Sequence, residues 1–151
     1  MSSARTRRRP SGGWRALADK TQEREGARRL AIAAARAADA KGASDVVILE
    51  VGDVLVVADE FVIASAPNDR LVKAIVDEIE REVAETPGLD GNQKPLRIEG
   101  RNERRWVLMD YGDVVIHVFL QEVRDYYELE RLWADVSRVE WAVPAPAATA
   151  R

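Results

Sequence analysis

The stretch from Trp106 to Val118, WVLMDYGDVVIHV, constrains the fold most, because two runs of strand-forming residues flank a tight turn in it. A two-residue turn at Tyr111 and Gly112 predicts a β-hairpin in which Asp110 faces Asp113. Residues opposite each other in a hairpin share one face of the sheet. One face is then wholly apolar and is expected to pack under helices; it consists of Val107, Met109, Val114, Ile116 and Val118.

The other face of the predicted hairpin mixes aromatic and charged residues: Trp106, Leu108, Asp110, Asp113, Val115 and His117. Like charges opposite each other destabilise a sheet by up to about 1 kcal/mol. Either the aspartates accept backbone N–H groups near the turn, or a partner's Lys or Arg neutralises them, and both explanations stay open. Tyr111 at the tip has little core to join, which is typical of an exposed binding residue. Core and contact roles both stay open for Trp106, whereas His117 is expected to be a hydrogen-bonded strand residue.

Helical and strand patterns alternate along the rest of the chain. Asn68 is a candidate N-cap, Gly42 is a candidate helix terminator, and the second strand region is expected to break near Asp59 and Glu60. The order α-β-β-α-β-β-β-α predicts an α/β fold, a single mixed β-sheet flanked by helices. The expected elements are helix 26–41, strand 45–51, strand region 54–66, helix 68–86, strand 96–100, the hairpin and helix 121–133.

The two ends of the chain differ from its middle in composition and charge. Residues 1–25 are rich in Arg, Ser and Gly and are predicted to be a disordered basic tail. The Pro/Ala-rich residues 140–151 are predicted to be a flexible tail. The predicted domain therefore covers residues 26–139. The net charge is +6 over residues 1–29 and −9 over residues 30–151. An acidic domain binds a phosphate backbone poorly and suits a basic protein surface, although the tail could add a weak contact to RNA.

Composition also excludes several kinds of site. The chain has no cysteine, which excludes disulfides, thiolate metal sites and thiol catalysis, and its single histidine disfavours a histidine-based zinc site. We expect no cofactor and no metal. The sequence shows no secretory signal and no membrane-spanning run, so a cytoplasmic protein is expected.

Two motifs carry a resemblance to a known family. The stretch WVLMDYGDVVIHVF from Trp106 and the stretch RDYYELERLW from Arg124 resemble the bacterial ribosomal silencing factor family (Iojap-related, RsfS). Weaker support comes from DVVILEV, from ADEFVIASAPNDR and from the pair Glu99-Gly100. The likeness covers roughly residues 27–136 and leaves out both tails.

The resemblance implies a translational repressor without enzymatic activity. Members of the family bind the large ribosomal subunit through its fourteenth ribosomal protein, block joining of the small subunit sterically, and form homodimers when free. Carried over, Trp106 and Tyr111 stand where the family places aromatic contacts to that protein. Asp110, Asp113 and Glu99 are inferred to be acidic partners for its Lys and Arg residues, and His117 completes the predicted site.

Two alternative functions stay open. The family fold resembles a nucleotidyltransferase core, whose chemistry requires two carboxylates at i, i+2 on one strand to hold magnesium. Here Asp110 and Asp113 are separated by a turn, Glu99 stands alone in its strand, and Asp69 would repel phosphate at the helix that follows it. The catalytic carboxylates are therefore missing from the expected pattern. A generic RNA-binding module that uses the basic tail is the other alternative, and its cationic residues would be Arg5, Arg7, Arg8 and Arg9.

Overall fold

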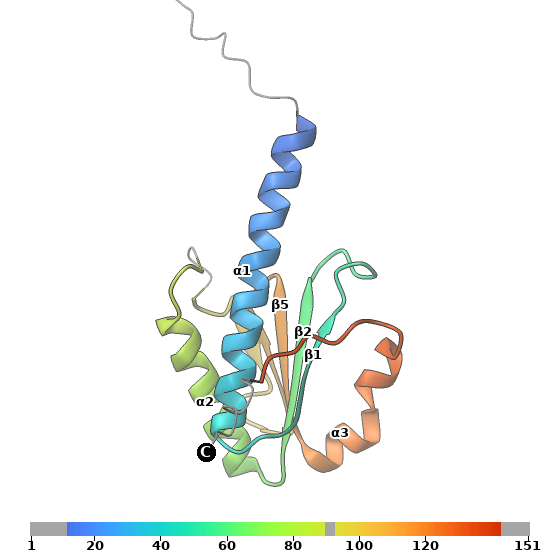
Figure 1. The fold of residues 1–151 in the computed structure, drawn as a ribbon. Coiled ribbons are helices and arrows are strands. Elements are labelled where there is room, and N and C mark those ends of the chain that lie inside the picture. Colours follow the sequence, from blue (N-terminus) through green and yellow to red (C-terminus); the bar gives the residue numbers. More distant parts are fainter. Residues whose placement is uncertain (1–11, 90–92, 143–151) are drawn as a thin grey trace, which may run out of the picture.

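A five-stranded mixed sheet organises the protein (Figure 1). The computed structural model describes residues 12–89 and 93–142. The strand order is β1-β2-β5-β4-β3, in which β2 and β5 run parallel and the other neighbours antiparallel. The strands are β1 (Ser44–Glu50), β2 (Glu60–Ala66), β3 (Arg97–Glu99), β4 (Trp106–Asp110) and β5 (Val114–Leu120). The predicted α/β fold with a single mixed sheet is confirmed.

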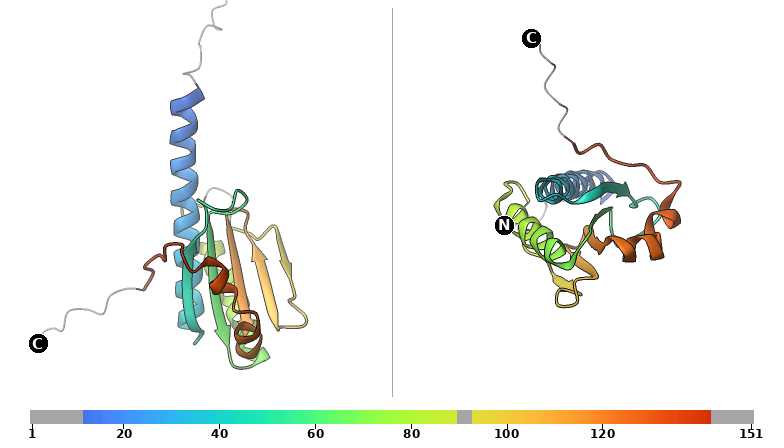
Figure 2. Two further views of the ribbon diagram at one scale, coloured as in Figure 1. Left: turned by 90° about the vertical axis from the view of Figure 1, so that its right-hand side faces the viewer. Right: turned by 90° about the horizontal axis from the view of Figure 1, so that it is seen from below.

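Two helices, α1 (Gly12–Ala40) and α2 (Asp69–Glu85), cover one face of the sheet (Figures 1 and 2). Small alanines let α1 approach the sheet closely, and α2 contributes a stripe of buried aliphatic residues at helical spacing. Asn68 caps α2 as predicted, because its Oδ1 accepts the Leu71 N–H at 2.8 Å. The predicted apolar hairpin face lies beneath these helices, so Val107, Met109, Val114, Ile116 and Val118 are all in the core.

The opposite face of the sheet is only partly covered. The helix α3 (Gln121–Tyr127) and the 3₁₀ helix η2 (Leu129–Trp133) follow β5 and turn back over this face. In the left view of Figure 2 they lie in front of the sheet, whereas β4 and β3 are left uncovered on this side. One face of β4 is therefore available for a partner.

The hairpin between β4 and β5 has a different register from the predicted one. Leu108 pairs with His117 and Asp110 with Val115, and the Tyr111 N–H donates to the Val114 carbonyl at 2.9 Å. The turn residues are therefore Gly112 and Asp113, and the predicted turn at Tyr111 and Gly112 is wrong. Gly112 has φ +92°, which suits glycine at the first position of such a turn. The shift preserves which residues share a face, but the predicted opposition of the two aspartates is wrong.

Both ends of the domain extend beyond the predicted limits. Residues 12–25, for which disorder was predicted, form the first turns of α1 and project past the sheet (Figure 1). At the other end, the Trp141 indole donates to the Val46 carbonyl at 3.0 Å, so residue 141 packs on the domain. Residues 1–11 and 143–151, which carry the rest of the two predicted tails, lie outside the described residues.

The predicted last helix over 121–133 is also interrupted. Glu128 adopts a left-handed conformation (φ +48°), which ends α3 and starts η2. Arg124 and Glu128 stand four residues apart, a spacing that allows an ion pair in a continuous helix. Among the described residues, however, Arg124 contacts Glu130 at 2.6 Å and Glu128 pairs with Arg131. No helix of the described chain is long and apolar enough to cross a membrane.

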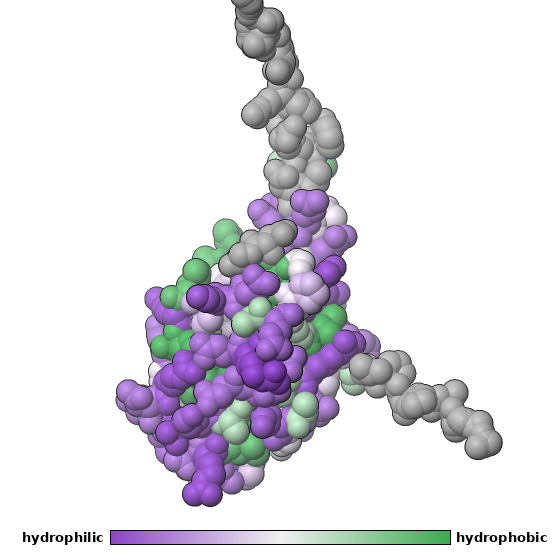
Figure 3. Space-filling view, turned by 90° about the vertical axis from the view of Figure 1, so that its left-hand side faces the viewer, coloured by the Kyte–Doolittle hydropathy of each residue, from purple (hydrophilic) through white to green (hydrophobic). Residues whose placement is uncertain are grey.

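The side of the molecule that carries α2 is largely hydrophilic (Figure 3). The exposed surface of α2 includes a network in which Arg81 pairs with Glu78, Glu82 and Glu85. A solvated, salt-bridged helix surface of this kind is typical of solvent-facing helices. The uncovered side of β4 is therefore the better candidate for a protein interface.

Candidate protein-binding face

The open face is the surface of β3, β4 and β5 that points away from α1 and α2. Its β4 residues are Trp106, Leu108 and Asp110, each of them half-buried. They alternate with core residues, since side chains of a strand point to opposite faces in turn. The cross-strand neighbours on the open face are Arg97 and Glu99 from β3, and Val115, His117 and Phe119 from β5.

Trp106 is held in place by other aromatic rings. Its ring centroid lies 4.8 Å from that of Phe119 and 5.2 Å from that of Tyr127. Its indole Nε1–H donates to Nδ1 of His117 at 3.1 Å. A half-buried tryptophan whose orientation is set by its neighbours loses little conformational freedom when a partner covers it. The indole of Trp106 is therefore held in one orientation on this face.

His117 supports this arrangement from beneath the surface. It is 5% exposed, and its ring lies between those of Phe61 and Phe119. Because Nδ1 accepts a hydrogen bond, the proton of the neutral ring is on Nε2, for which the described residues provide no acceptor. Burial lowers the pKa of His117 from 6.5 to about 4. The expected strand histidine is hydrogen-bonded through Nδ1 only, and that bond holds the indole of Trp106 in place.

The charged edge of the open face comes from β3 and the end of β4. Nε of Arg97 lies 3.2 Å from Oε2 of Glu99 and 3.5 Å from Oδ2 of Asp110. The other oxygen of Asp110 accepts the Gly112 N–H at 2.8 Å. This confirms, for Asp110, the alternative in which an aspartate near the turn accepts a backbone N–H group. The structure thus brings Glu99 and Asp110 to the same edge, with one exposed arginine between them.

Tyr111 does not belong to the open face. Its side chain is 3% exposed and lies in the core beneath α1 and α2, so the predicted exposed tyrosine at the hairpin tip is wrong. The physical reason is the register, because pairing with Val114 turns the ring to the helix-covered side. Burial raises the pKa of Tyr111, and nearby Glu80 adds to the effect. Asp113 also lies away from Trp106, in the turn at the far end of β4.

The buried hydroxyl of Tyr111 leads to a prediction about stability. No hydrogen-bond partner for it exists among the described residues, and an unsatisfied buried hydroxyl costs free energy. We expect Tyr111→Phe to leave the free energy of unfolding unchanged or to raise it by up to about 1 kcal/mol in urea titrations. Tyr126→Phe, at an 80% exposed tyrosine, serves as the control. A loss of more than about 1 kcal/mol at Tyr111 would contradict the inferred isolation of the hydroxyl.

Sequence reasoning placed Leu108 and Val115 on this face and left open whether the last helix belongs to it, but it did not show which residues of other elements meet there. Phe61 and Tyr127 contact the rings of His117 and Trp106, and Trp133 lies edge-on to Phe61 at 5.6 Å. No short-range sequence pattern predicts these contacts, because they join residues of β2, α3 and η2 to one another and to the hairpin, far apart in the chain. The aromatic content of the last predicted helix was the available signal.

Comparison with known proteins identifies the family. The sequence model described as "Ribosomal silencing factor during starvation" matches residues 24–151. The chain belongs to the ribosomal silencing factor family. The ribosomal silencing factor RsfS of Bacillus subtilis (strain 168) is 45% identical over 102 residues, which are 68% of this chain and 82% of that protein. The resemblance seen in the sequence motifs is confirmed.

Other relatives extend the comparison to structures and to organelles. The crystal structure of protein CV0518 from Chromobacterium violaceum is similar with a TM-score of 0.65 and 29% identity, over 80% of this chain and 95% of that one. The mouse protein named "Mitochondrial assembly of ribosomal large subunit protein 1" is 34% identical over 94 residues, which are 62% of this chain and 40% of that protein. Silencing factors and a ribosome assembly protein therefore share this domain, and the names of these relatives describe no enzyme.

Proposed function

We propose that this ribosomal silencing factor binds the large ribosomal subunit through its fourteenth ribosomal protein and blocks joining of the small subunit sterically. Membership of the family supports a role at the ribosome. The observation that supports the docking mode is the open face, where Trp106 is held half-buried by Phe119, Tyr127 and His117. Aromatic anchors of this kind dominate the binding energy of many protein interfaces.

The charge of the domain favours a protein contact over an RNA contact. Residues 30–151 carry a net charge of −9, and Glu99 and Asp110 lie at the edge of the open face. Acidic groups repel the phosphate backbone but attract Lys and Arg residues of a basic ribosomal protein. In this proposal the carboxylates steer association and set its salt dependence, whereas Trp106 and Leu108 supply most of the affinity.

The proposed mechanism is occlusion and requires no cofactor and no reaction. A domain docked on the large subunit at the subunit interface occupies volume that the small subunit needs. Asn68 already caps α2, with Asp69 in its first turn, so this helix start does not favour a nucleotide phosphate. We further propose that the free protein forms a homodimer, and that its Arg-rich N-terminal residues add only a weak, salt-dependent RNA contact.

Truncation of the aromatic anchor tests the docking mode. We expect Trp106→Ala to weaken binding to isolated large subunits by about 1–3 kcal/mol, which is roughly 5- to 150-fold in Kd, in co-sedimentation titrations. The same variant should lose its inhibition of subunit joining in parallel, because both effects depend on one docking event. Wild-type binding that is equal for the two isolated subunits would refute the proposed function itself.

Trp141→Ala is the matched control for this experiment. Trp141 is also half-buried, but it packs against α1 and β1 on another part of the domain. Both variants remove one indole and its hydrogen bond, so each is expected to lower stability. Only the Trp106 variant should weaken binding when both are compared well below their unfolding temperatures. Equal weakening by the two variants would show that stability, and not contact, accounts for the loss.

A further inference from the structure

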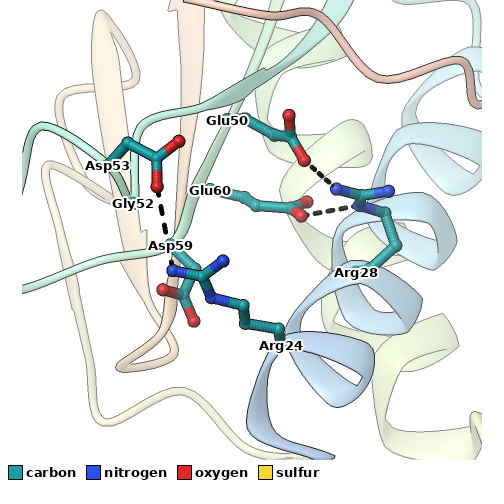
Figure 4. Close-up of a pocket in the computed structure, with 7 residues that line it drawn as sticks. All are labelled: Arg24, Arg28, Glu50, Gly52, Asp53, Asp59 and Glu60. Carbon is teal, nitrogen blue, oxygen red and sulfur yellow. Dashed lines mark hydrogen bonds and ion pairs between the residues drawn. The ribbon is translucent and has the colours of Figure 1, made fainter. Parts of the chain in front are cut away.

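A second, chemically different hollow lies beside α1, at the end of the sheet where β1 stops and β2 begins (Figure 4). It adjoins a neighbouring hollow under the loop that joins these strands, and the two share Arg24, Gly52, Asp53 and Asp59. We call the combined space the acidic pocket. Its carboxylates are Glu23, Glu50, Asp53, Asp59, Glu60 and Asp113.

The basic residues that line the pocket are Lys20, Arg24 and Arg28, and they neutralise only part of the charge of its six carboxylates. Arg28 donates to Oε2 of Glu60 at 2.6 Å and also to Glu50, and Arg24 lies 3.8 Å from Asp53. Figure 4 shows Arg28 reaching from α1 to both glutamates. In contrast, Asp59 and Asp113 have no Lys or Arg within 4.0 Å among the described residues. The hollow therefore keeps a net negative charge on the side of Asp59 and Asp113.

Glu60 makes this negative charge costly for the protein. Glu60 is 3% exposed and lines the pocket, and its Oε1 has no hydrogen-bond partner among the described residues. A buried carboxylate oxygen without a donor is unfavourable. Burial raises the pKa of Glu60 although Arg28 opposes the effect, and burial beside Asp59 and Glu23 raises the pKa of Asp113. Glu60 is already paired with Arg28 and its free oxygen is buried, so a cation that enters the pocket would act on Asp59 and Asp113 and relieve the repulsion between these two carboxylates.

An apolar rim adjoins the acidic pocket. Val54, Val56 and Val57 are 63%, 101% and 77% exposed at the tip of the loop. The loop itself is well anchored, because the N–H groups of Val51 and Gly52 donate to the Asp59 carbonyl at 2.9 and 3.0 Å. Three exposed valines on an anchored loop beside unpaired carboxylates form a mixed surface that suits a basic and partly apolar segment.

We propose that the acidic pocket binds an Arg or Lys side chain of a basic protein segment whose apolar neighbour packs on the valine loop. Arg28 already shows how a guanidinium is held here by two carboxylates. No group of three or more His, Asp and Glu residues in the described chain is arranged to hold a metal ion, so an organic cation fits better. A nucleic acid is disfavoured, because its phosphates would face the carboxylates of the pocket.

This pocket is separate from the open face. Asp113 lies in the turn after β4, whereas Trp106 begins that strand at its other end. The proposed contact is thus a second one, which does not depend on docking through Trp106. A protein with two such surfaces could hold a large-subunit partner and a further basic segment at the same time.

A short peptide provides the probe. The acetylated and amidated peptide Leu-Arg-Ala-Arg-Leu would be titrated into the full-length ¹⁵N-labelled protein, with the amide shifts of residues 50–60 and 113 as the readout. We expect the shifts to be confined to this region and Trp106→Ala to leave them unchanged. Replacement of both arginines of the peptide by citrulline, which is neutral and of the same shape, should weaken binding at least about tenfold.

Charge removal on the protein gives the second measurement. Asp59→Asn combined with Asp113→Asn should weaken binding of the arginine peptide at least about fivefold. Asp39→Asn combined with Asp135→Asn changes the net charge equally at exposed positions outside the pocket and should leave the affinity unchanged. Equal affinity for the arginine and citrulline peptides, shifts elsewhere on the surface, or no binding would each overturn the proposal. The peptide comparison on wild-type protein stands even if the double variant fails to fold.

Discussion

Arg124→Ala is expected to lower the free energy of unfolding by about 3–5 kcal/mol. The Arg124 side chain is 5% exposed and donates to Oε2 of Glu130 at 2.6 Å and to the Ser65 hydroxyl at 3.0 Å. These contacts join α3 and η2 to the sheet. Although burial opposes its ionisation, Arg124 holds the pKa of Glu130 below its ordinary value. Removal of the guanidinium leaves the half-buried carboxylate of Glu130 without its partner and removes the donor to Ser65, and both losses add to the loss of the attraction itself.

The matched control is Arg131→Ala, because Arg131 forms the other ion pair of this segment. It lies 2.8 Å from Glu128, but the two side chains are 79% and 49% exposed. Exposed ion pairs contribute at most about 1 kcal/mol, so guanidinium-chloride titrations should separate the two variants clearly. A loss of less than about 1 kcal/mol for Arg124→Ala would mean that α3 is held mainly by apolar packing.

The stability of the protein is expected to fall by about 3 kcal/mol between pH 6.5 and pH 4 because of His117. Its pKa is lowered from 6.5 to about 4 by burial in the folded state. As the pH falls through this window, the unfolded chain takes up a proton that the folded chain does not, so unfolding becomes more favourable. Below about pH 4 the folded state is protonated as well, and the loss from this group is complete.

His117→Asn isolates this contribution, because His117 is the only histidine of the chain. The asparagine amide oxygen can accept the Trp106 N–H but does not titrate. The difference in unfolding free energy between wild type and variant, measured by urea titration at pH 7 and pH 4, should change by about 3 kcal/mol. Carboxylates with shifted pKa values act in both proteins and cancel in this difference. If the unfolding free energies of wild type and variant changed equally between pH 7 and pH 4, His117 would not account for the loss of stability.

The faces of the hairpin could be predicted from the sequence even though its register could not. Alternation assigned Trp106 and Leu108 to one face and Val107 and Met109 to the other, and a shift of one position in each strand leaves this assignment unchanged. Tyr111 was misassigned because the turn begins one residue later than predicted. The sequence offers two adjacent candidate turns, Tyr-Gly and Gly-Asp. The structure has the Gly-Asp turn, and in it the tyrosine ring packs in the core.

Features that depend on distant contacts lay beyond sequence reasoning. A network that holds the last helix to the sheet was one possible role of the motif residues Arg124 and Glu130, and Arg124 does contact Glu130 and Ser65. The sequence did not indicate the helix break at Glu128 or the part played by Ser65. Trp141 packs on Val46 from a stretch whose composition is typical of a flexible tail. The acidic pocket likewise joins residues of α1, of the β1–β2 loop and of the β4–β5 turn, so its charge was visible only as an excess of acidic residues.

The projecting part of α1 has a consequence for how the protein fills space. From Gly12 to Arg24 the helix adds about 20 Å of length. The side chains of residues 20–25 are all exposed, and among the described residues their ion pair to the rest of the domain is that of Arg24 with Asp53 at 3.8 Å. These turns therefore gain little from tertiary packing and rely mainly on intrinsic helix propensity. On warming, the first turns of α1 should therefore unfold before the rest of the domain does. The hydrodynamic radius of the protein should therefore change with temperature well below global unfolding. The volume from which the protein excludes a neighbouring macromolecule should change in parallel.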